Sequence, residues 1–246
     1  MLEAVDLSRS LRPRRYKRRR DELRRRLLDL QRACWNQDVG SLLVFEGWAF
    51  SGRGKVIDRL TRRLEPRGLV LHHVRAPRSG EDGLPWMWRF WNSLPRFGQM
   101  GIYYGSWYRR LLVGRSTGRV SEAAAERSFE DIESFETMLA ADRYVVAKFF
   151  FHLDLHEQSA RMAAAEADPL EEWKLDTDEW DRRVLDPHNL RLAEEMLSRT
   201  SFPATPWHLV AGNDRRWATI EVFERTIAAL EAGLSRLGCE LPEGAP

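Results

Sequence analysis

Short apolar runs alternate with longer amphipathic stretches along the chain. The apolar runs have the length of strands, and the run at 144–153 is almost unbroken, as expected of a strand buried on both faces of a sheet. Strands are therefore predicted at 42–45, 69–74, 100–104, 144–153 and 207–211. Helices are predicted at 14–36, 55–64, 86–94, 121–141, 156–197 and 216–237.

Strands separated by helices at this spacing form a parallel sheet with right-handed crossovers. The pattern therefore predicts one α/β domain, a three-layer sandwich with a five-stranded parallel sheet. We place this domain at residues 41–237, after a basic helical segment at 1–40 and before a tail at 238–246. Residues 156–197 are helical in pattern and polar, and we assign them as the helical lid of this domain.

The segment after the first strand has the layout of a phosphate-binding loop. In the intact pattern, G-x-x-x-x-G-K-[ST], backbone N–H groups surround phosphate, the lysine reaches the β- and γ-phosphates and the hydroxyl helps to hold magnesium. Gly47 and Gly52 keep the glycine spacing, whereas Arg53 stands at the lysine position and Gly54 at the hydroxyl position, with Lys55 following. The layout predicts a P-loop kinase-like fold with a helical lid, but with altered chemistry.

Charge gives little information about partners. The 246 residues include 39 basic and 37 acidic ones, for a net charge of +2. Arginines nevertheless crowd residues 9–26, either as a solvated helix face or as an electropositive flank of a polyanion site. A nucleic-acid binder that uses this helix is disfavoured by the near-neutral net charge.

Cysteine use and hydropathy predict a cytoplasmic protein. Cys34 and Cys239 match no metal-ligand spacing and are interpreted as reduced thiols. No run of 18 or more apolar residues is present, and the N-terminus lacks the apolar core of a secretory signal. We therefore expect no membrane partner.

A series of different short motifs follows along the chain from about residue 15 to 232. In chain order these motifs are Phe45-Glu46-Gly47, 64–68, 88–91, Ser106-Trp107-Tyr108, Lys148-Phe149, 151–153, Trp173-Lys174, Pro206-Trp207 and 214–216. Together they resemble the polyphosphate kinase 2 family, which moves phosphoryl groups between inorganic polyphosphate and nucleotides. The segments 88–91 and 103–108 look like the degenerate amino-terminal half of the tandem polyphosphate:AMP phosphotransferases. The resemblance implies polyphosphate and a nucleotide as partners.

The chain departs from the family pattern where the chemistry is concentrated. Ala49 and Tyr104 stand at the positions of two acidic residues, Arg53 at that of the loop lysine and Gly105 at that of an arginine. In the lid, Arg161 and Lys174 remain, but alanine and glutamate replace much of the rest. Phosphoryl transfer depends on neutralising charge and on a metal that bridges the phosphates. Losing the carboxylate anchors of Mg²⁺ therefore predicts weak or absent activity.

The leading prediction is a degenerate polyphosphate kinase 2-like protein. It would bind phosphate or polyphosphate, or act as a non-catalytic partner of itself in a homo-oligomer or of a catalytic homologue. No certain catalytic residue or metal ligand is predicted. The candidate phosphate-binding residues are Gly47, Gly52, Arg53, Gly54, Lys55, Arg161, Lys174, Arg215 and Arg216. The alternative is an active polyphosphate-dependent AMP or ADP phosphotransferase, in which Asp214, Glu46 or another carboxylate holds Mg²⁺.

Two further groups have competing interpretations. The histidines at 72, 73 and 152 are expected to pack in the core or at strand ends rather than to bind metal. Trp86, Trp88 and Trp91 are expected in the core or in a subunit contact, and stacking on a nucleotide is the alternative.

Overall fold

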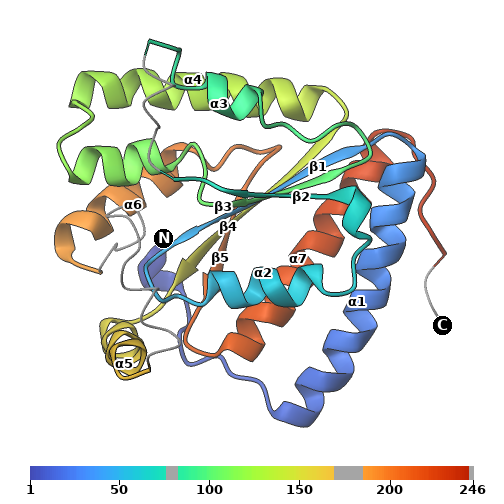
Figure 1. Ribbon diagram of the computed structural model, residues 1–246, viewed down its shortest axis with the longest axis horizontal. Helices are drawn as coiled ribbons and strands as arrows, with labels where there is room; N and C mark the ends of the chain where they lie inside the picture. Colours follow the sequence, from blue (N-terminus) through green and yellow to red (C-terminus); the bar gives the residue numbers. More distant parts are fainter. Residues whose placement is uncertain (76–82, 169–184, 244–246) are drawn as a thin grey trace.

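The computed structural model describes residues 1–75, 83–168 and 185–243, which form a parallel α/β sandwich (Figure 1). The strands are β1 (Gly40–Gly47), β2 (Leu69–His73), β3 (Met100–Tyr104), β4 (Tyr144–His152) and β5 (Trp207–Ala211). Their order in the sheet is β2-β3-β1-β4-β5, and all neighbouring pairs are parallel. The predicted fold class is confirmed.

The central strands are apolar at nearly every position because helices cover both faces of the sheet. In β1, Leu42 and Val44 belong to the core on one face, and Leu43 and Phe45 to the core on the other. β4 alternates in the same way. The unbroken apolar run thus reports burial on two sides, as the sequence pattern indicated.

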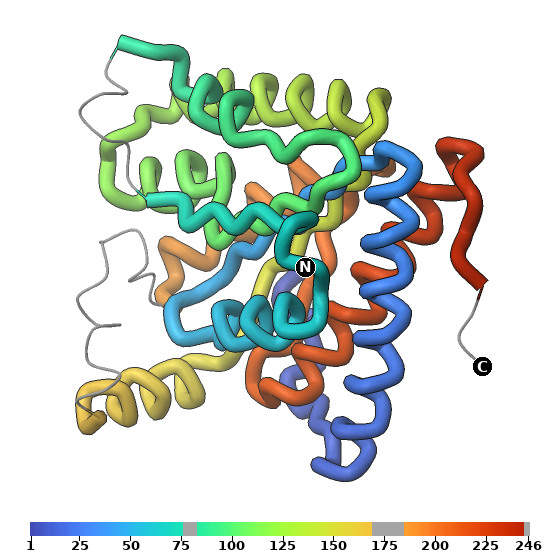
Figure 2. The backbone as a smooth tube through the Cα atoms, turned by 45° about the vertical axis from the view of Figure 1, so that its right-hand side comes forward, coloured from blue at the N-terminus to red at the C-terminus, as the bar shows by residue number. Residues whose placement is uncertain are grey.

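The helices form one layer on each face of the sheet. One face carries α1 (Pro13–Asn36), α2 (Arg53–Thr61) and α7 (Arg215–Arg236), and α1 lies along α7 in both views (Figures 1 and 2). The other carries α3 (Trp88–Trp91), the π-helix η4 (Arg110–Gly114), α4 (Glu122–Ala141) and α6 (Pro187–Arg199). α5 (Leu155–Glu166) lies at the margin of the molecule, and short 3-10 turns occur at Leu2–Ala4 and Pro66–Gly68.

The basic N-terminal segment is built into the sandwich. Leu23, Leu27 and Leu30 of α1 are buried in the same core as α7. Part of the arginine-rich surface of α1 is bound to α7, since Arg19 pairs with Glu224 at 2.8 Å. α1 is therefore one helix of the layer and also carries a charged outer surface.

Three predicted helices differ from the structure by more than one residue at an end. α2 begins at Arg53 rather than Lys55, because Gly52 adopts a left-handed conformation (φ 91°) directly before it. The helix predicted at 86–94 is reduced to α3, where the Ser93 hydroxyl donates to the Phe90 carbonyl and competes with continued helix. The segment 156–197 divides into α5 and α6, and the part at 169–184 lies outside the described residues.

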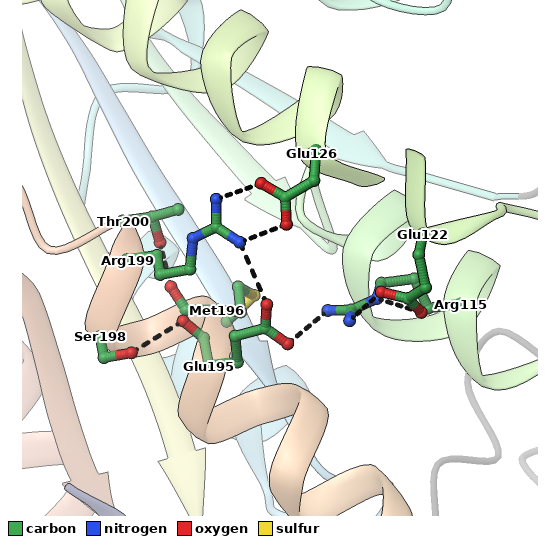
Figure 3. Close-up of polar contacts among 8 residues, drawn as sticks. All are labelled: Arg115, Glu122, Glu126, Glu195, Met196, Ser198, Arg199 and Thr200. Atoms are coloured by element: carbon green, nitrogen blue, oxygen red, sulfur yellow. Dashed lines mark hydrogen bonds and ion pairs between the residues drawn. The ribbon is translucent and has the colours of Figure 1, made fainter. Parts of the chain in front are cut away.

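α6 is held to the body of the domain although it belongs to the segment predicted as a lid. Arg199 donates two hydrogen bonds of 2.7 Å to Glu126 of α4 and another to Glu195 (Figure 3). Arg115 bridges Glu122 and Glu195 in the same network. Among the described parts of the segment, α5 is thus the one that lies away from the core.

Candidate phosphate-binding site

The loop from Gly47 to Gly52 leaves the carboxyl end of β1, where open α/β sheets bind their ligands. Gly47 (φ 139°) lies against β4, and a Cβ there would lie 2.7 Å from the Phe151 nitrogen and closer still to its carbonyl oxygen. Phe50 has a positive φ of 58°, which is uncommon outside glycine. The loop therefore keeps a constrained backbone, and its tight turns depend on the two glycines that the sequence singled out.

Arg53 is the first residue of α2, and its side chain is turned inward. It is 3% exposed, and its Nη1 lies 3.4 Å from the Gly47 carbonyl and 3.8 Å from Glu46 Oε2. Its guanidinium carbon lies 4.6 Å from the centre of the Tyr104 ring, which is the geometry of a cation–π contact. An arginine stacked on tyrosine thus stands between the ends of β1 and β3.

Glu46 is fully buried in the same region, which we call the loop corner and define by Glu46, Arg53 and Tyr104. It accepts a hydrogen bond of 2.9 Å from the Ser106 hydroxyl, which in turn accepts one from the Tyr108 nitrogen. The carboxylate therefore joins the end of β1 to the segment after β3.

Neither Ala49 nor Tyr104 supplies a ligand for Mg²⁺. Ala49 is 5% exposed, and its carbonyl accepts a hydrogen bond of 3.0 Å from Gln158 of α5. The Tyr104 ring contacts Arg53 on one side and His73 at 5.1 Å. Within the described residues no group of three or more His, Cys, Asp or Glu side chains could hold a metal ion. The donor set at this corner does not fit a protein-anchored magnesium site.

The alternative carboxylate Asp214 has a structural role. It caps α7 by accepting hydrogen bonds from the backbone nitrogens of Arg216 and Trp217, and it also accepts one from Leu11. These bonds hold the pKa of Asp214 below its usual value although partial burial opposes them.

Arg161 joins the loop to the segment that follows β5. Its guanidinium donates to the carbonyls of Phe50 (3.0 Å), Gly212 (2.9 Å) and Asn213 (2.7 Å), and its Nε donates to Glu157. Burial, with the nearby Arg215, lowers its pKa. Arg161 therefore holds the loop in place from α5, a role that sequence reasoning missed because its partners are backbone atoms far away in the chain.

Arg215 is exposed at the start of α7 and reaches the mouth of the loop. A Cβ at Gly52 would lie 3.5 Å from Arg215 Cγ and 3.6 Å from Arg161 Nη1. Arg216 is instead paired with Asp214 at 3.2 Å. The structure thus brings Arg53, Arg161 and Arg215 around the loop glycines and turns Arg216 toward the helix cap.

Three other predicted site residues remain to be placed. Gly54 lies on the first turn of α2 and faces Tyr104, with 3.4 Å between a Cβ built there and the ring. Lys55 is exposed on the same turn. Lys174 lies outside the described residues.

The motif segments after β3 and in β4 meet in a buried polar network. Lys148 donates to Glu136 at 2.7 Å, and Glu136 also accepts from Trp107 and Tyr108. Burial lowers the pKa of Lys148 and raises that of Tyr108 well above its usual value. The network fixes the segment after β3 and lies on the α4 side of the sheet.

The histidines pack as expected. Nδ1 of His152 accepts a buried hydrogen bond of 2.8 Å from the Trp48 indole, and burial lowers the pKa of this histidine. His72 stacks on Tyr103 with 4.7 Å between ring centres. These contacts agree with packing rather than metal binding.

A cavity of about 380 Å³ lies near the carboxyl ends of β2 and β3. It is lined by aromatic and basic side chains, among them Trp86, Trp88, Phe90, Trp107, Arg89 and Arg110. Of the tryptophans, Trp88 is 42% exposed. The sequence pointed to the aromatic cluster but not to the hollow that it lines.

Comparison of the sequence with known proteins identifies a family. The polyphosphate kinase 2 model matches residues 10–236. A polyphosphate:AMP phosphotransferase of Pseudomonas syringae pv. tomato is 35% identical over 78% of this chain and 39% of its own length. An ADP-polyphosphate phosphotransferase of Pseudomonas aeruginosa is 32% identical over 92% of this chain and 74% of its own.

The fold is also shared with solved structures. A crystal structure described as polyphosphate kinase 2 from Pseudomonas aeruginosa PA01 superposes with a TM-score of 0.86 at 30% identity, covering 96% of this chain and 50% of that one. The molecule is thus a parallel α/β protein of the P-loop kinase type. It belongs to the polyphosphate kinase 2 family.

The chain spans less than half the length of the polyphosphate:AMP phosphotransferases that it matches, 39%, 45% and 48% of three of them. Among the described residues, no helix is long and apolar enough to cross a membrane.

Proposed function

We propose that this chain binds a phosphate-rich anion, inorganic polyphosphate or a shorter phosphate, and transfers phosphoryl groups weakly or not at all. The observation that carries the proposal is the stacking of Arg53 on Tyr104 at 4.6 Å. The family resemblance expects a lysine and a magnesium-site aspartate at these positions. A guanidinium is attracted to the face of an aromatic ring, and this interaction needs no metal.

The backbone of the loop supports anion binding. Gly47, Gly52 and the start of α2 keep the turn in which N–H groups and the helix dipole attract negative charge. Arg215 lies exposed at the mouth, and its side chain forms no hydrogen bond or ion pair recorded within the described residues. Lys55 and Lys174 remain proposed contributors, and Arg216 would join only by leaving Asp214.

The proposal follows the resemblance to the amino-terminal half of tandem polyphosphate:AMP phosphotransferases. The chain spans 39%, 45% and 48% of the length of three such relatives, which is compatible with one domain of a tandem protein. In this role the chain would pair with itself or with a catalytic homologue, and the exposed Trp91 (43%) is a candidate contact.

Turnover provides the test. Purified protein, polyphosphate, Mg²⁺ and AMP or ADP should give negligible phosphoryl transfer, because the carboxylate anchors of the metal are missing at Ala49 and Tyr104. The ADP-polyphosphate phosphotransferase of Pseudomonas aeruginosa serves as the positive control. Robust turnover that depends on Mg²⁺ and disappears in Arg53→Ala would contradict the proposal.

The cavity near β2 and β3 favours a second candidate function, an active AMP or ADP phosphotransferase. Its indole rings and guanidinium groups suit a nucleobase and a phosphate, and its volume suits a small ligand. AMP should then quench tryptophan fluorescence, and Trp88→Ala should weaken that response. Absence of quenching at millimolar AMP would count against a nucleotide in the cavity.

A further inference from the structure

Gly105, directly after β3, is covered by the side chain of Arg109. Gly105 has φ 73°, and a Cβ built on it would lie 2.5 Å from Arg109 Cζ, 2.7 Å from Nη2 and closer still to Nε. Any side chain at 105 would overlap the guanidinium. The left-handed backbone favours glycine here, and a side chain at 105 would displace the guanidinium of Arg109 from this position.

The guanidinium of Arg109 lies at the carboxyl end of the sheet. The Gly105 nitrogen donates to the Phe45 carbonyl at 3.0 Å, so the backbone under the guanidinium is bonded to the end of β1. The next residue, Ser106, donates to Glu46. Arg109 is therefore placed beside the residues that form the bottom of the phosphate-binding loop.

The charges of this corner favour an anion. Arg53 and Arg109 are 3% and 1% exposed, and the fully buried Glu46 lies 3.8 Å from Arg53. A buried guanidinium interacts strongly with an anion because little water screens the two charges from each other. The resemblance puts an arginine at 105 in the family, and here the arginine comes from one helical turn further along the chain.

We propose that Arg109 is a further cation of the anion site and that Gly105 is the residue that lets it reach the end of β3. The ligand class is an inorganic oligophosphate, and the inference rests on the function proposed above. The competing explanation is a structural brace, in which the guanidinium only supports the turn after β3.

Tripolyphosphate binding, measured by calorimetry at low salt without metal, separates the two explanations. Arg109→Gln should lower the affinity about ten- to hundredfold, as expected when a hydrogen bond between charged groups is lost. Arg109→Lys keeps the positive charge but loses the planar, bidentate donor geometry of the guanidinium. This variant should lose less affinity than Arg109→Gln. The matched control is Arg115→Gln, since the side chain of Arg115 is only 7% exposed but lies in the network with Glu122 and Glu195.

Thermal unfolding of the same variants completes the experiment. Arg115→Gln should lower the melting temperature without changing the affinity. The inference is overturned if Arg109→Gln binds tripolyphosphate within about twofold of the wild type, or if the lysine and glutamine variants lose affinity equally. No binding by the wild-type chain would overturn the proposed anion binding as well, so the two failures are distinguishable.

Discussion

Two buried ion pairs, one in the core under α4 and one at the end of β1, differ in how tightly they are built. On the α4 side, Lys148 and Glu136 are fully buried and 2.7 Å apart. Glu136 also accepts a hydrogen bond from Thr205, and Lys148 donates to the Thr200 carbonyl at 2.6 Å. Four segments of the chain meet in this pair.

The pair in the loop corner is looser. Arg53 and Glu46 are 3.8 Å apart, and the hydrogen bond from Arg53 to the Gly47 carbonyl is long at 3.4 Å. The loop above them contains Phe50 at a positive φ. The difference indicates that the first pair holds its part of the scaffold more tightly than the second pair holds the end of β1.

Breaking the tight pair should have the largest effect. Lys148→Met leaves Glu136 buried without its cation and should lower the free energy of unfolding by about 3–5 kcal/mol. Urea unfolding followed by circular dichroism measures the loss. Adding Glu136→Leu to Lys148→Met should recover part of it, because no charge then remains buried. A loss below about 1 kcal/mol in Lys148→Met would contradict the role assigned to the network.

The loop should tolerate less change at Gly47 than an ordinary turn does. Gly47→Ala places a methyl group against the Phe151 backbone and should cost about 2–4 kcal/mol. Gly118→Ala is the matched control, since Gly118 also has a positive φ (69°) but has nothing within 4 Å of a built Cβ, so about 1–2 kcal/mol is expected. Equal losses of stability in the two variants would show that contact with β4 does not constrain the loop.

His208 on β5 should make stability depend on pH. Burial, followed by the charges of Arg225 and Lys148, lowers its pKa from 6.5 to about 4. The unfolded chain therefore binds a proton that the folded chain does not, and stability present above about pH 6.5 is lost as the pH falls toward 4.

Allowing for partial exposure, the loss should be about 1–3 kcal/mol. Urea unfolding at pH 7 and pH 4.5 tests it, with His208→Gln expected to flatten the difference. An unchanged difference in His208→Gln would assign the pH dependence to other groups.

Restoring the lost acids should change the metal response of the loop corner. In Ala49→Asp with Tyr104→Asp, tripolyphosphate should bind more weakly in EDTA than in the wild type, and Mg²⁺ should strengthen binding about tenfold. Tyr104→Phe, which keeps the ring against Arg53, is the control and should not respond to Mg²⁺. Calorimetry of the three proteins gives the comparison, and a response in Tyr104→Phe would refute it.

Much of the fold follows from the sequence because each strand and helix carries its own local signal. The apolar run of β4 and the helical spacing of Leu23, Leu27 and Leu30 predicted elements that the structure confirms. The short α3 was predicted too long, since a single side-chain hydrogen bond at Ser93 is invisible in a hydrophobic pattern.

The candidate site was predictable only in part. Glycine spacing identified the loop, but the inward turn of Arg53 and the cross-link by Arg161 depend on contacts between distant segments. Arg109 gave no motif signal, because its place beside the loop depends on the left-handed backbone of Gly105. Such features require the folded backbone and not only the order of residue types.

The most direct test of the central claim is the affinity of the wild-type chain for tripolyphosphate at low salt, measured in EDTA and again with Mg²⁺. If Arg53, Arg215 and the loop glycines form the phosphate site, tripolyphosphate should bind in EDTA. The affinity should fall as salt screens the charges and should not increase with Mg²⁺. Binding that is absent in EDTA and appears only with Mg²⁺ would contradict a metal-free site.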